Sequence, residues 1–286
     1  MQIITLTSDM GLTDHYVASL KGTILSRTPE VQIVDISHDV QAFDVAQQAF
    51  YLNNCFRDFP KGTIHICCVD SEPIINFGSS QDSSVPAILF YEGHYFVSND
   101  NGFFGLLLKN APAESFWKID DVLSNPSLYR FPTKNILIPA ACRIANGEAL
   151  DSFASQSDEY KRSIAIAAVI GENLIKGNVI HIDHYGNVIT NVTRELFDRF
   201  GENIPFTIFF RRKEYYIDEI SPSYNAVVPG EKVAVFNSNG FLEIALNRGA
   251  RTTTGGASTL FGLSINDIVR IEFLPRGSKE TIDSLF

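Results

Sequence analysis

The chain has 286 residues, 45% of them hydrophobic and 20% charged, and its formal net charge at neutral pH is −10. This composition is typical of a globular protein with one large core or two modest ones. Because 33 acidic residues outnumber 23 basic ones and the basic residues do not cluster, a duplex nucleic-acid partner is not expected.

No apolar segment approaches the roughly 20 residues that a membrane-spanning helix needs, so no membrane partner is expected. The chain starts directly with the strand-like MQIITL, without a basic segment or a small-residue cleavage site, which predicts a cytoplasmic protein. The cysteines have no metal-ligand spacing and are expected to be reduced thiols. Two of them, Cys67 and Cys68, are neighbours in a predicted strand and should therefore point to opposite faces.

Strand and helix patterns alternate over the first 70 residues. Apolar runs and helical periodicity predict strands at 2–8, 31–37 and 62–70, and helices at 14–27 and 44–55. The first helix should bury Val17, Leu20, Ile24 and Leu25, and Asp44 is placed to cap the second. Because the strands are almost continuously apolar, this alternation predicts a mostly parallel sheet with helices on both faces.

The middle of the chain predicts a loop, a hairpin and a helix. Residues 71–86 are polar and turn-rich, which is typical of a flexible loop. The next apolar stretch predicts a hairpin that turns at Glu92 and Gly93. Residues 133–147 predict a helix that contains Pro139 and ends at Gly147.

From residue 177 onward, short alternating strands are separated by turn residues at 185–187, 212–213 and 237–240. This pattern predicts an all-β domain, either a small barrel or a sandwich. We therefore expect an α/β domain over residues 1–165 and a β-barrel-like domain over residues 174–286.

Aspartates stand where open sheets bind their ligands, beyond the carboxyl ends of strands. Asp9 and Asp14 flank the first strand-to-helix turn, Asp70 ends the third strand, and Asp183 lies beside a turn in the second domain. Each alone could equally be a helix cap or a turn former. Together they fit a polar, partly cationic small molecule, because one carboxylate can accept both hydroxyls of a ribose and another can bind an ammonium group.

Amide groups at Asn187 and in the NSNG turn, which includes Asn239, can read the edge of a base. The chain has no GxGxxG, phosphate-loop or HExxH pattern, and its six histidines have no convincing metal spacing. No metal and no separate cofactor are therefore expected.

Five segments in chain order carry a resemblance to one known family: ITLTSDMGLTDHYVASLKGTI, VQIVDISHDVQAFDVAQQAFYL, FPKGTIHICCVD, HIDHYGNVITNV and FNSNGFLEIALNRGA. They resemble the S-adenosyl-L-methionine hydroxide adenosyltransferase family, which includes fluorinase and chlorinase enzymes. The resemblance covers residues 3 to about 275. It implies a homotrimer whose active sites lie between the N-terminal domain of one chain and the C-terminal domain of the next.

The resemblance also implies roles for residues of the first domain. Asp9 falls on the carboxylate that binds the ribose 2′- and 3′-hydroxyls, and Asp14 falls on a residue that holds the methionine end. Phe43 matches an aromatic residue that lines the ligand pocket. In the family reaction, water or halide attacks C5′ of S-adenosyl-L-methionine and releases methionine.

In the second domain the resemblance implies further ligand contacts. Asp183 falls on another residue at the methionine end, and Ser238 falls on a contact to the methionine carboxylate. Tyr185 and Asn187 match the aromatic ring and the amide that meet the adenine.

The chain departs from the family pattern where the water is handled. Hydroxide-using members employ an Asp, an Arg and a His, and Asp70 keeps the first of these. No arginine lies between Arg57 and Arg130, and Pro132 stands where the family His is expected. His94 or Lys134, from elsewhere in the fold, is a possible substitute. Thr133 matches a halide-contacting position, but the chain lacks a long insertion like that of the fluorinase.

Two functions from different classes remain open at this stage. The first is hydrolysis of S-adenosyl-L-methionine to adenosine and L-methionine, impaired or altered by the missing groups. The second is a catalytically inactive protein that binds adenosine or S-adenosyl-L-methionine.

Overall fold

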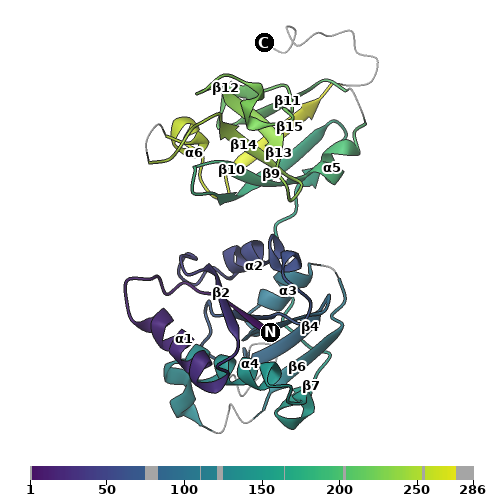
Figure 1. The fold of residues 1–286 in the computed structure, drawn as a ribbon. Helices are drawn as coiled ribbons and strands as arrows, with labels where there is room; N and C mark the ends of the chain where they lie inside the picture. The colour runs from purple at the N-terminus through teal and green to yellow at the C-terminus, as the bar shows by residue number, and fades with distance from the viewer. Residues whose placement is uncertain are drawn as a thin grey trace. The chain divides into compact units, whose positions relative to one another are not determined.

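The computed structural model describes residues 2–74, 83–109, 111–120, 125–163, 165–201, 204–252 and 255–274. It divides the chain into two compact units, Met1–Ala165 and Ile166–Phe286 (Figure 1). Half of the predicted loop at 71–86, residues 75–82, lies outside the described residues. None of the helices that the structure describes is long and apolar enough to cross a membrane.

A seven-stranded sheet forms the centre of the first unit, in the spatial order β2-β1-β3-β5-β4-β6-β7. Its strands are β1 (Ile3–Thr7), β2 (Gln32–Ser37), β3 (Ile64–Cys67), β4 (Pro86–Tyr91), β5 (His94–Asn99), β6 (Ser115–Ile119) and β7 (Ala154–Gln156). The first three lie where the apolar runs predict them.

The sheet is mixed, so the prediction of a mostly parallel sheet is wrong. β1 pairs in parallel with β2 and β3, and β3 pairs in parallel with β5. β4 then pairs antiparallel with β5, and β6 and β7 continue antiparallel at that edge. The cause is the predicted turn at Glu92 and Gly93, which both have positive φ, because a two-residue turn can join only antiparallel strands.

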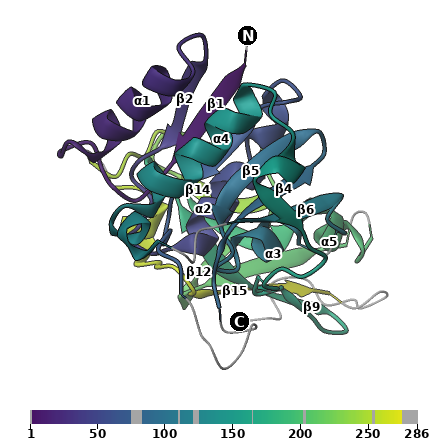
Figure 2. The same cartoon turned by 90° about the horizontal axis from the view of Figure 1, so that it is seen from below.

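Helices cover both faces of this sheet (Figures 1 and 2). They are α1 (Tyr16–Arg27), α2 (Val45–Asn53), α3 (Phe103–Leu108) and α4 (Ile138–Ala145). Buried residues of α1 and α4 form one core with the sheet, and those of α2 and α3 form another. Cys68 belongs to the first core and Cys67 to the second, so the two neighbours do point to opposite faces.

The helix ends follow local sequence signals. Asp44 caps α2, because its carboxylate accepts a backbone hydrogen bond from the first turn at 2.9 Å. In α1, Val17, Leu20 and Ile24 are buried as predicted, whereas Leu25 is 47% exposed. Leu25 follows Ile24 directly and is therefore rotated by about 100° around the helix, away from the core.

The helix predicted at 133–147 forms in two parts. A π-helical turn at Thr133–Leu137 leads into α4, and Pro139 lies in the first turn of α4, where its missing N–H has no partner to lose. Gly147 follows the helix with a φ of 77°. Short 3₁₀ turns at Phe56–Asp58, Pro126–Arg130 and Leu150–Ser152 complete this unit.

The second unit is all antiparallel, in the spatial order β12-β11-β15-β9-β10-β14-β13, with β8 added beside β9. Its strands are β8 (Val169–Ile170), β9 (Leu174–Ile182), β10 (Val188–Thr193), β11 (Phe206–Phe210), β12 (Arg212–Ile217), β13 (Lys232–Phe236), β14 (Phe241–Leu246) and β15 (Ile268–Phe273). β12 and β13 also approach each other, so the sheet is a nearly closed barrel around one apolar core.

Short helical elements connect these strands: α5 (Arg194–Asp198), α6 (Ala257–Phe261) and a 3₁₀ turn at Tyr224–Ala226. Two of the three predicted turns lie where expected, between β9 and β10 and between β13 and β14. The turn predicted at 212–213 lies one residue earlier, at Arg211, which has a φ of 61°.

Candidate functional site

Two predicted site residues stand at one edge of the first sheet. β1 ends at Thr7 and β3 ends at Cys67, and these residues are register partners in parallel neighbouring strands. Asp9 and Asp70 follow these strand ends, so both lie beyond the carboxyl edge. The topology therefore places two aspartates that are far apart in the sequence beyond the same end of the sheet.

Asp9 is oriented by a contact from Phe43. The backbone N–H of Phe43 donates a hydrogen bond of 3.0 Å to Oδ2 of Asp9. Phe43 has a φ of 64° and is 75% exposed, so its aromatic ring is presented at the surface. Asp14 is also exposed and lies two residues before α1 begins.

The Asp70 backbone is held from two elements. The side-chain amide of Asn101 donates to the Asp70 carbonyl at 2.9 Å and to the Val69 carbonyl at 3.2 Å. Gln48, fully buried on α2, accepts the Val69 N–H at 3.0 Å. Asp70 itself has a φ of 49°, a conformation that non-glycine residues rarely adopt and that requires such support.

The segment at Pro132 and Thr133 passes beside Ser71, the residue after Asp70. The hydroxyls of Thr133 and Ser71 lie 2.9 Å apart, and Ser71 follows Asp70 directly. Pro132, buried in front of Thr133, has a side chain that neither donates nor accepts a hydrogen bond. Among the residues that the structure describes, this segment thus offers a hydroxyl beside Ser71.

Neither suggested substitute takes over that place. His94 is the first residue of β5, which runs parallel to β3, so it lies at the opposite, amino-terminal edge of the sheet. There it is buried against His65, with 3.4 Å between Nδ1 of His94 and Nε2 of His65. The Lys134 ammonium donates to the Ser19 hydroxyl of α1 at 2.8 Å.

In the second unit, the β9–β10 turn carries three predicted site residues. The Asn187 N–H donates to Oδ1 of Asp183 at 2.8 Å, and its side-chain amide donates to Oδ2 at 3.1 Å. Tyr185, at the tip, is 60% exposed. Gly186 has a φ of 83° and leaves no room for a side chain, because a Cβ there would lie 3.0 Å from the Cα of Gly256.

The NSNG turn carries the other two, Ser238 and Asn239, both exposed. Its geometry is set by Asn237, whose Oδ1 accepts the N–H groups of Asn239 and Phe241 at 3.1 Å each. The Asn237 amide donates at 3.2 Å to Oε2 of Glu243, a residue of β14.

Glu243 connects the two turns of the second unit. It is only 3% exposed, and its Oε1 accepts the hydroxyl proton of Tyr224 at 2.7 Å. Burial raises the pKa of Glu243, and the nearby charge of Asp183 raises it as well. Hydrogen bonds from Tyr224, Asn237 and Asn187 lower it by less. Sequence reasoning missed this glutamate, although an acidic residue inside the apolar run FLEIAL is a signal for a buried, partnered carboxylate.

Two family models match most of the chain. The SAM hydroxide adenosyltransferase N-terminal domain matches residues 4–154, and the C-terminal domain of the same family matches residues 177–270.

Named relatives extend over both units. The chain is 30% identical to (R)-S-adenosyl-L-methionine hydrolase of Methanocaldococcus jannaschii over 86% of its length and 88% of that protein. It is 26% identical to a fluorinase of Nocardia brasiliensis over 86% and 90% of the two chains. A crystal structure of an uncharacterized conserved protein from Thermotoga maritima matches with a TM-score of 0.78 at 26% identity, covering 95% of this chain and 99% of that one.

The architecture defines a class of two-domain proteins in which a mixed α/β unit precedes a nearly closed antiparallel barrel and acidic loops occur in both. Within that class, the chain belongs to the SAM hydroxide adenosyltransferase family.

Proposed function

We propose that this protein binds S-adenosyl-L-methionine and hydrolyses it slowly to adenosine and L-methionine. The observation that carries the proposal is the placement of Asp9 and Asp70 at one edge of the first sheet, with the Asp9 carboxylate oriented by Phe43. The names of its relatives, S-adenosyl-L-methionine hydrolases and fluorinases, support a ligand of this kind.

In the proposed reaction, the oxygen of water attacks C5′ and the C5′–S bond breaks. Its electron pair stays on sulfur, so methionine leaves as a neutral thioether and needs neither an acid nor a cofactor. Asp70 positions the water and takes up the released proton. Without a neighbouring imidazole or guanidinium, we expect the rate to be lowered by part of the about 10²–10⁴-fold that general acid–base groups typically contribute.

Each remaining contact is proposed from the family resemblance. Asp9 accepts the two ribose hydroxyls beside the ring of Phe43, while Asp14 and Asp183 bind the methionine ammonium. Tyr185, Asn187 and Asn239 face the adenine, and Ser238 binds the methionine carboxylate. The charges suit the ligand, because carboxylates attract its ammonium and sulfonium groups.

We also propose that both groups of residues meet in a site between subunits of a homotrimer. The first unit carries the ribose carboxylate and the second carries the amides suited to the base, so neither set alone covers the ligand. Sedimentation equilibrium of the purified protein should give three times the mass of the chain. A monomer would contradict the intersubunit site.

A second function is favoured by one specific observation. The family resemblance implies an imidazole at the position of Pro132, and the hydroxyl of the next residue, Thr133, lies 2.9 Å from that of Ser71. A protein that keeps the nucleoside contacts and has lost turnover would bind adenosine or S-adenosyl-L-methionine as its final ligand.

The deciding experiment is incubation with S-adenosyl-L-methionine and chromatographic detection of adenosine, beside a calorimetric titration with adenosine. Adenosine formation above the spontaneous rate, lost in Asp70→Asn but kept in Asp58→Asn, would establish the hydrolase. Asp58 is a suitable control because it is exposed and precedes β3. Tight binding without turnover would establish the binding protein instead.

A further inference from the structure

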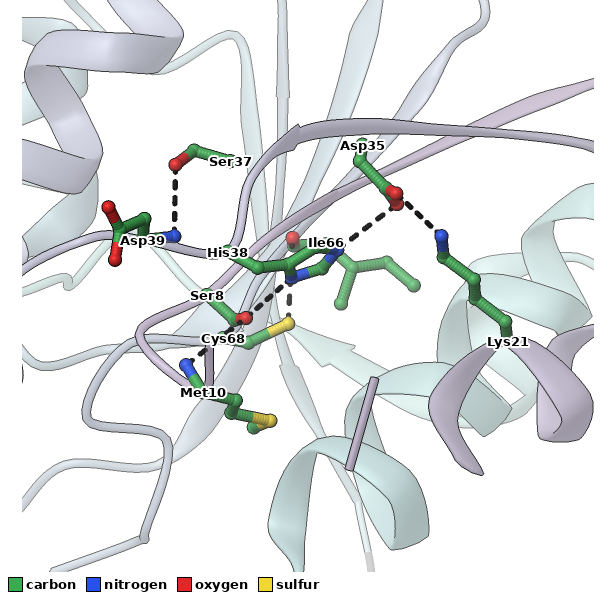
Figure 3. A network of polar contacts seen from close by, with 9 residues as sticks. All are labelled: Ser8, Met10, Lys21, Asp35, Ser37, His38, Asp39, Ile66 and Cys68. Atoms are coloured by element: carbon green, nitrogen blue, oxygen red, sulfur yellow. Dashed lines mark hydrogen bonds and ion pairs between the residues drawn. The ribbon is translucent and has the colours of Figure 1, made fainter. Parts of the chain in front are cut away.

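A buried histidine, His38, is the centre of a network of polar contacts in the first unit (Figure 3). His38 follows β2, is 5% exposed, and has its Nδ1 2.7 Å from Oγ of Ser8, the residue before Asp9. Its Nε2 lies 3.1 Å from Oδ1 of Asp35 in β2. The other oxygen of Asp35 accepts a hydrogen bond of 2.5 Å from the Lys21 ammonium of α1. One imidazole therefore links the ends of two neighbouring strands to the first helix.

The donors in this chain of contacts run in one direction. The Lys21 ammonium can only donate and a charged Asp35 can only accept, so a proton on Nε2 of His38 is the tautomer that suits its 3.1 Å approach to Asp35. Burial raises the pKa of Asp35, but hydrogen bonds from Lys21 and His38 outweigh it and hold the pKa below its ordinary value. Nδ1 is then free to accept the Ser8 hydroxyl proton, and Oγ of Ser8 accepts the Met10 N–H at 3.4 Å.

The order Asp35, His38, Ser8 is also that of a serine-hydrolase triad, but a nucleophilic role does not fit. Ser8 has no exposed surface, so its Oγ cannot reach the carbon of a substrate. The network therefore acts on the position of the loop that begins at Ser8, and not through a reaction of the Ser8 hydroxyl.

Backbone hydrogen bonds tie the same two segments together. The Ser8 N–H donates to the Ser37 carbonyl at 2.9 Å, and the Gly11 N–H donates to the His38 carbonyl at 2.7 Å. In the sequence, Asp9 thus lies between two residues that are hydrogen-bonded to the end of β2 and to the residue after it. Figure 3 shows the His38 side chain beside Ser8 at this junction.

We propose that His38 is a positioning residue for Asp9, which it aims at the two hydroxyls of a ribose by fixing the Ser8 side of the loop. The proposal rests on the proposed binding of a nucleoside. It assigns to His38 the selectivity for a ligand that carries an intact 2′,3′-diol.

The test compares adenosine with 2′,3′-dideoxyadenosine in calorimetric titrations of the full chain. In His38→Asn we expect adenosine affinity to fall about tenfold, as for the loss of one ordinary hydrogen bond, and dideoxyadenosine affinity to stay within about twofold. Ser8→Ala, which removes the contact and keeps the backbone, should give the same selective loss even where His38→Asn folds poorly.

His65→Asn is the matched control. His65 is fully buried in β3, and its Nδ1 lies 2.8 Å from the hydroxyl of Thr5 in β1. It thus makes the same kind of contact as His38 makes with Ser8, but away from the strand end that carries Asp9. We expect His65→Asn to lower the free energy of unfolding without changing the ratio of the two affinities. An equal ratio change in this control would overturn the positioning role, because general destabilisation would explain both variants.

Asp9→Ala separates the two levels of the argument. If Asp9→Ala removes the preference for adenosine while His38→Asn and Ser8→Ala keep it, the role of His38 is overturned and the ribose assignment survives. If Asp9→Ala itself leaves the preference unchanged, the ribose assignment fails and the role of His38 falls with it.

Discussion

The backbone N–H of Phe43 donates a hydrogen bond of 3.0 Å to Oδ2 of Asp9. Phe43 has a φ of 64°, which is unfavourable for a residue with a Cβ. The contact fixes one carboxylate oxygen and leaves Oδ1 and further lone pairs of Asp9 for a ligand. Local strain at Phe43 is thus coupled to the direction of a single carboxylate, an arrangement typical of binding sites.

Replacing Asp9 by alanine should weaken adenosine binding by about 1.5–3 kcal/mol, the contribution of hydrogen bonds to a charged group. Calorimetry measures this directly. Asp39→Ala, an exposed aspartate on the neighbouring segment, is the control for the loss of one negative charge. Unchanged affinity in Asp9→Ala would contradict the ribose assignment.

Phe43→Gly should separate stability from binding. Glycine removes the positive-φ strain, worth about 1 kcal/mol, and the ring that is lost buries little apolar surface because it is 75% exposed. We therefore expect a protein that unfolds at a urea concentration no lower than the wild type but binds adenosine more weakly. Phe43→Leu, which keeps a Cβ and loses the ring, should lose affinity without the compensating stability.

Gly256→Ala should damage the β9–β10 turn. A Cβ at this position would lie 2.3 Å from the Tyr185 carbonyl oxygen and 2.6 Å from the Gly186 Cα, so backbone has to move. The expected loss of stability is about 1–3 kcal/mol, with weaker adenosine binding because the turn carries Asp183 and Asn187. Gly22→Ala, with open space around it in α1, should instead stabilise by about 0.5–1 kcal/mol. Equal effects of the two substitutions on urea unfolding would refute this account.

Asp100 gives the fold a pH dependence that opposes ordinary acid denaturation. It follows β5, and its two carboxylate oxygens accept the Lys161 N–H at 3.0 and 3.1 Å. Burial raises the pKa of Asp100 to about 6, although that hydrogen bond and the charges of Lys118 and Lys161 lower it. Since the native state then holds the proton more tightly than the unfolded chain, this contribution is complete below about pH 4 and is lost as the pH rises through about 6.

Asp100→Asn should remove that pH dependence, because asparagine stays neutral, so between pH 4 and 7 the variant should gain stability relative to the wild type by at most about 3 kcal/mol. The measurement is urea unfolding of both proteins at several pH values, and the quantity of interest is the difference between them, in which other carboxylates cancel. Asp151→Asn, at an exposed position of the same unit, controls for the change in net charge. A difference that does not vary between pH 4 and 7 would show that Asp100 titrates normally.

Periodicity in the sequence was enough to locate the first strands and helices, because burial on one face leaves a repeat that can be read locally. The prediction of a mostly parallel sheet is wrong although the sequence contains a signal for antiparallel strands. Glu92 and Gly93 form a two-residue turn, which requires antiparallel partners. The parallel pattern of the first three strands was extended past that turn.

The supporting polar residues escaped sequence reasoning for a different reason. Gln48 is bonded to a residue 21 positions away, and His38 to one 30 positions away, so no local spacing reveals either contact. Each has one sequence signal only, a polar residue within or beside a predicted buried element, and that signal does not identify the partner.

The two cores of the first unit each contain one member of an adjacent cysteine pair. Burial raises the pKa of Cys68 to about 12 and also raises the pKa of Cys67 well above its ordinary value, so each thiol stays unreactive until the helices that cover it separate from the sheet. The rate of alkylation at each cysteine can be followed by mass spectrometry. The rate at Cys68 would measure how fast α1 and α4 separate from the sheet, and the rate at Cys67 would measure the same for α2 and α3. The two adjacent cysteines therefore report separately on the opening of the two faces of one sheet.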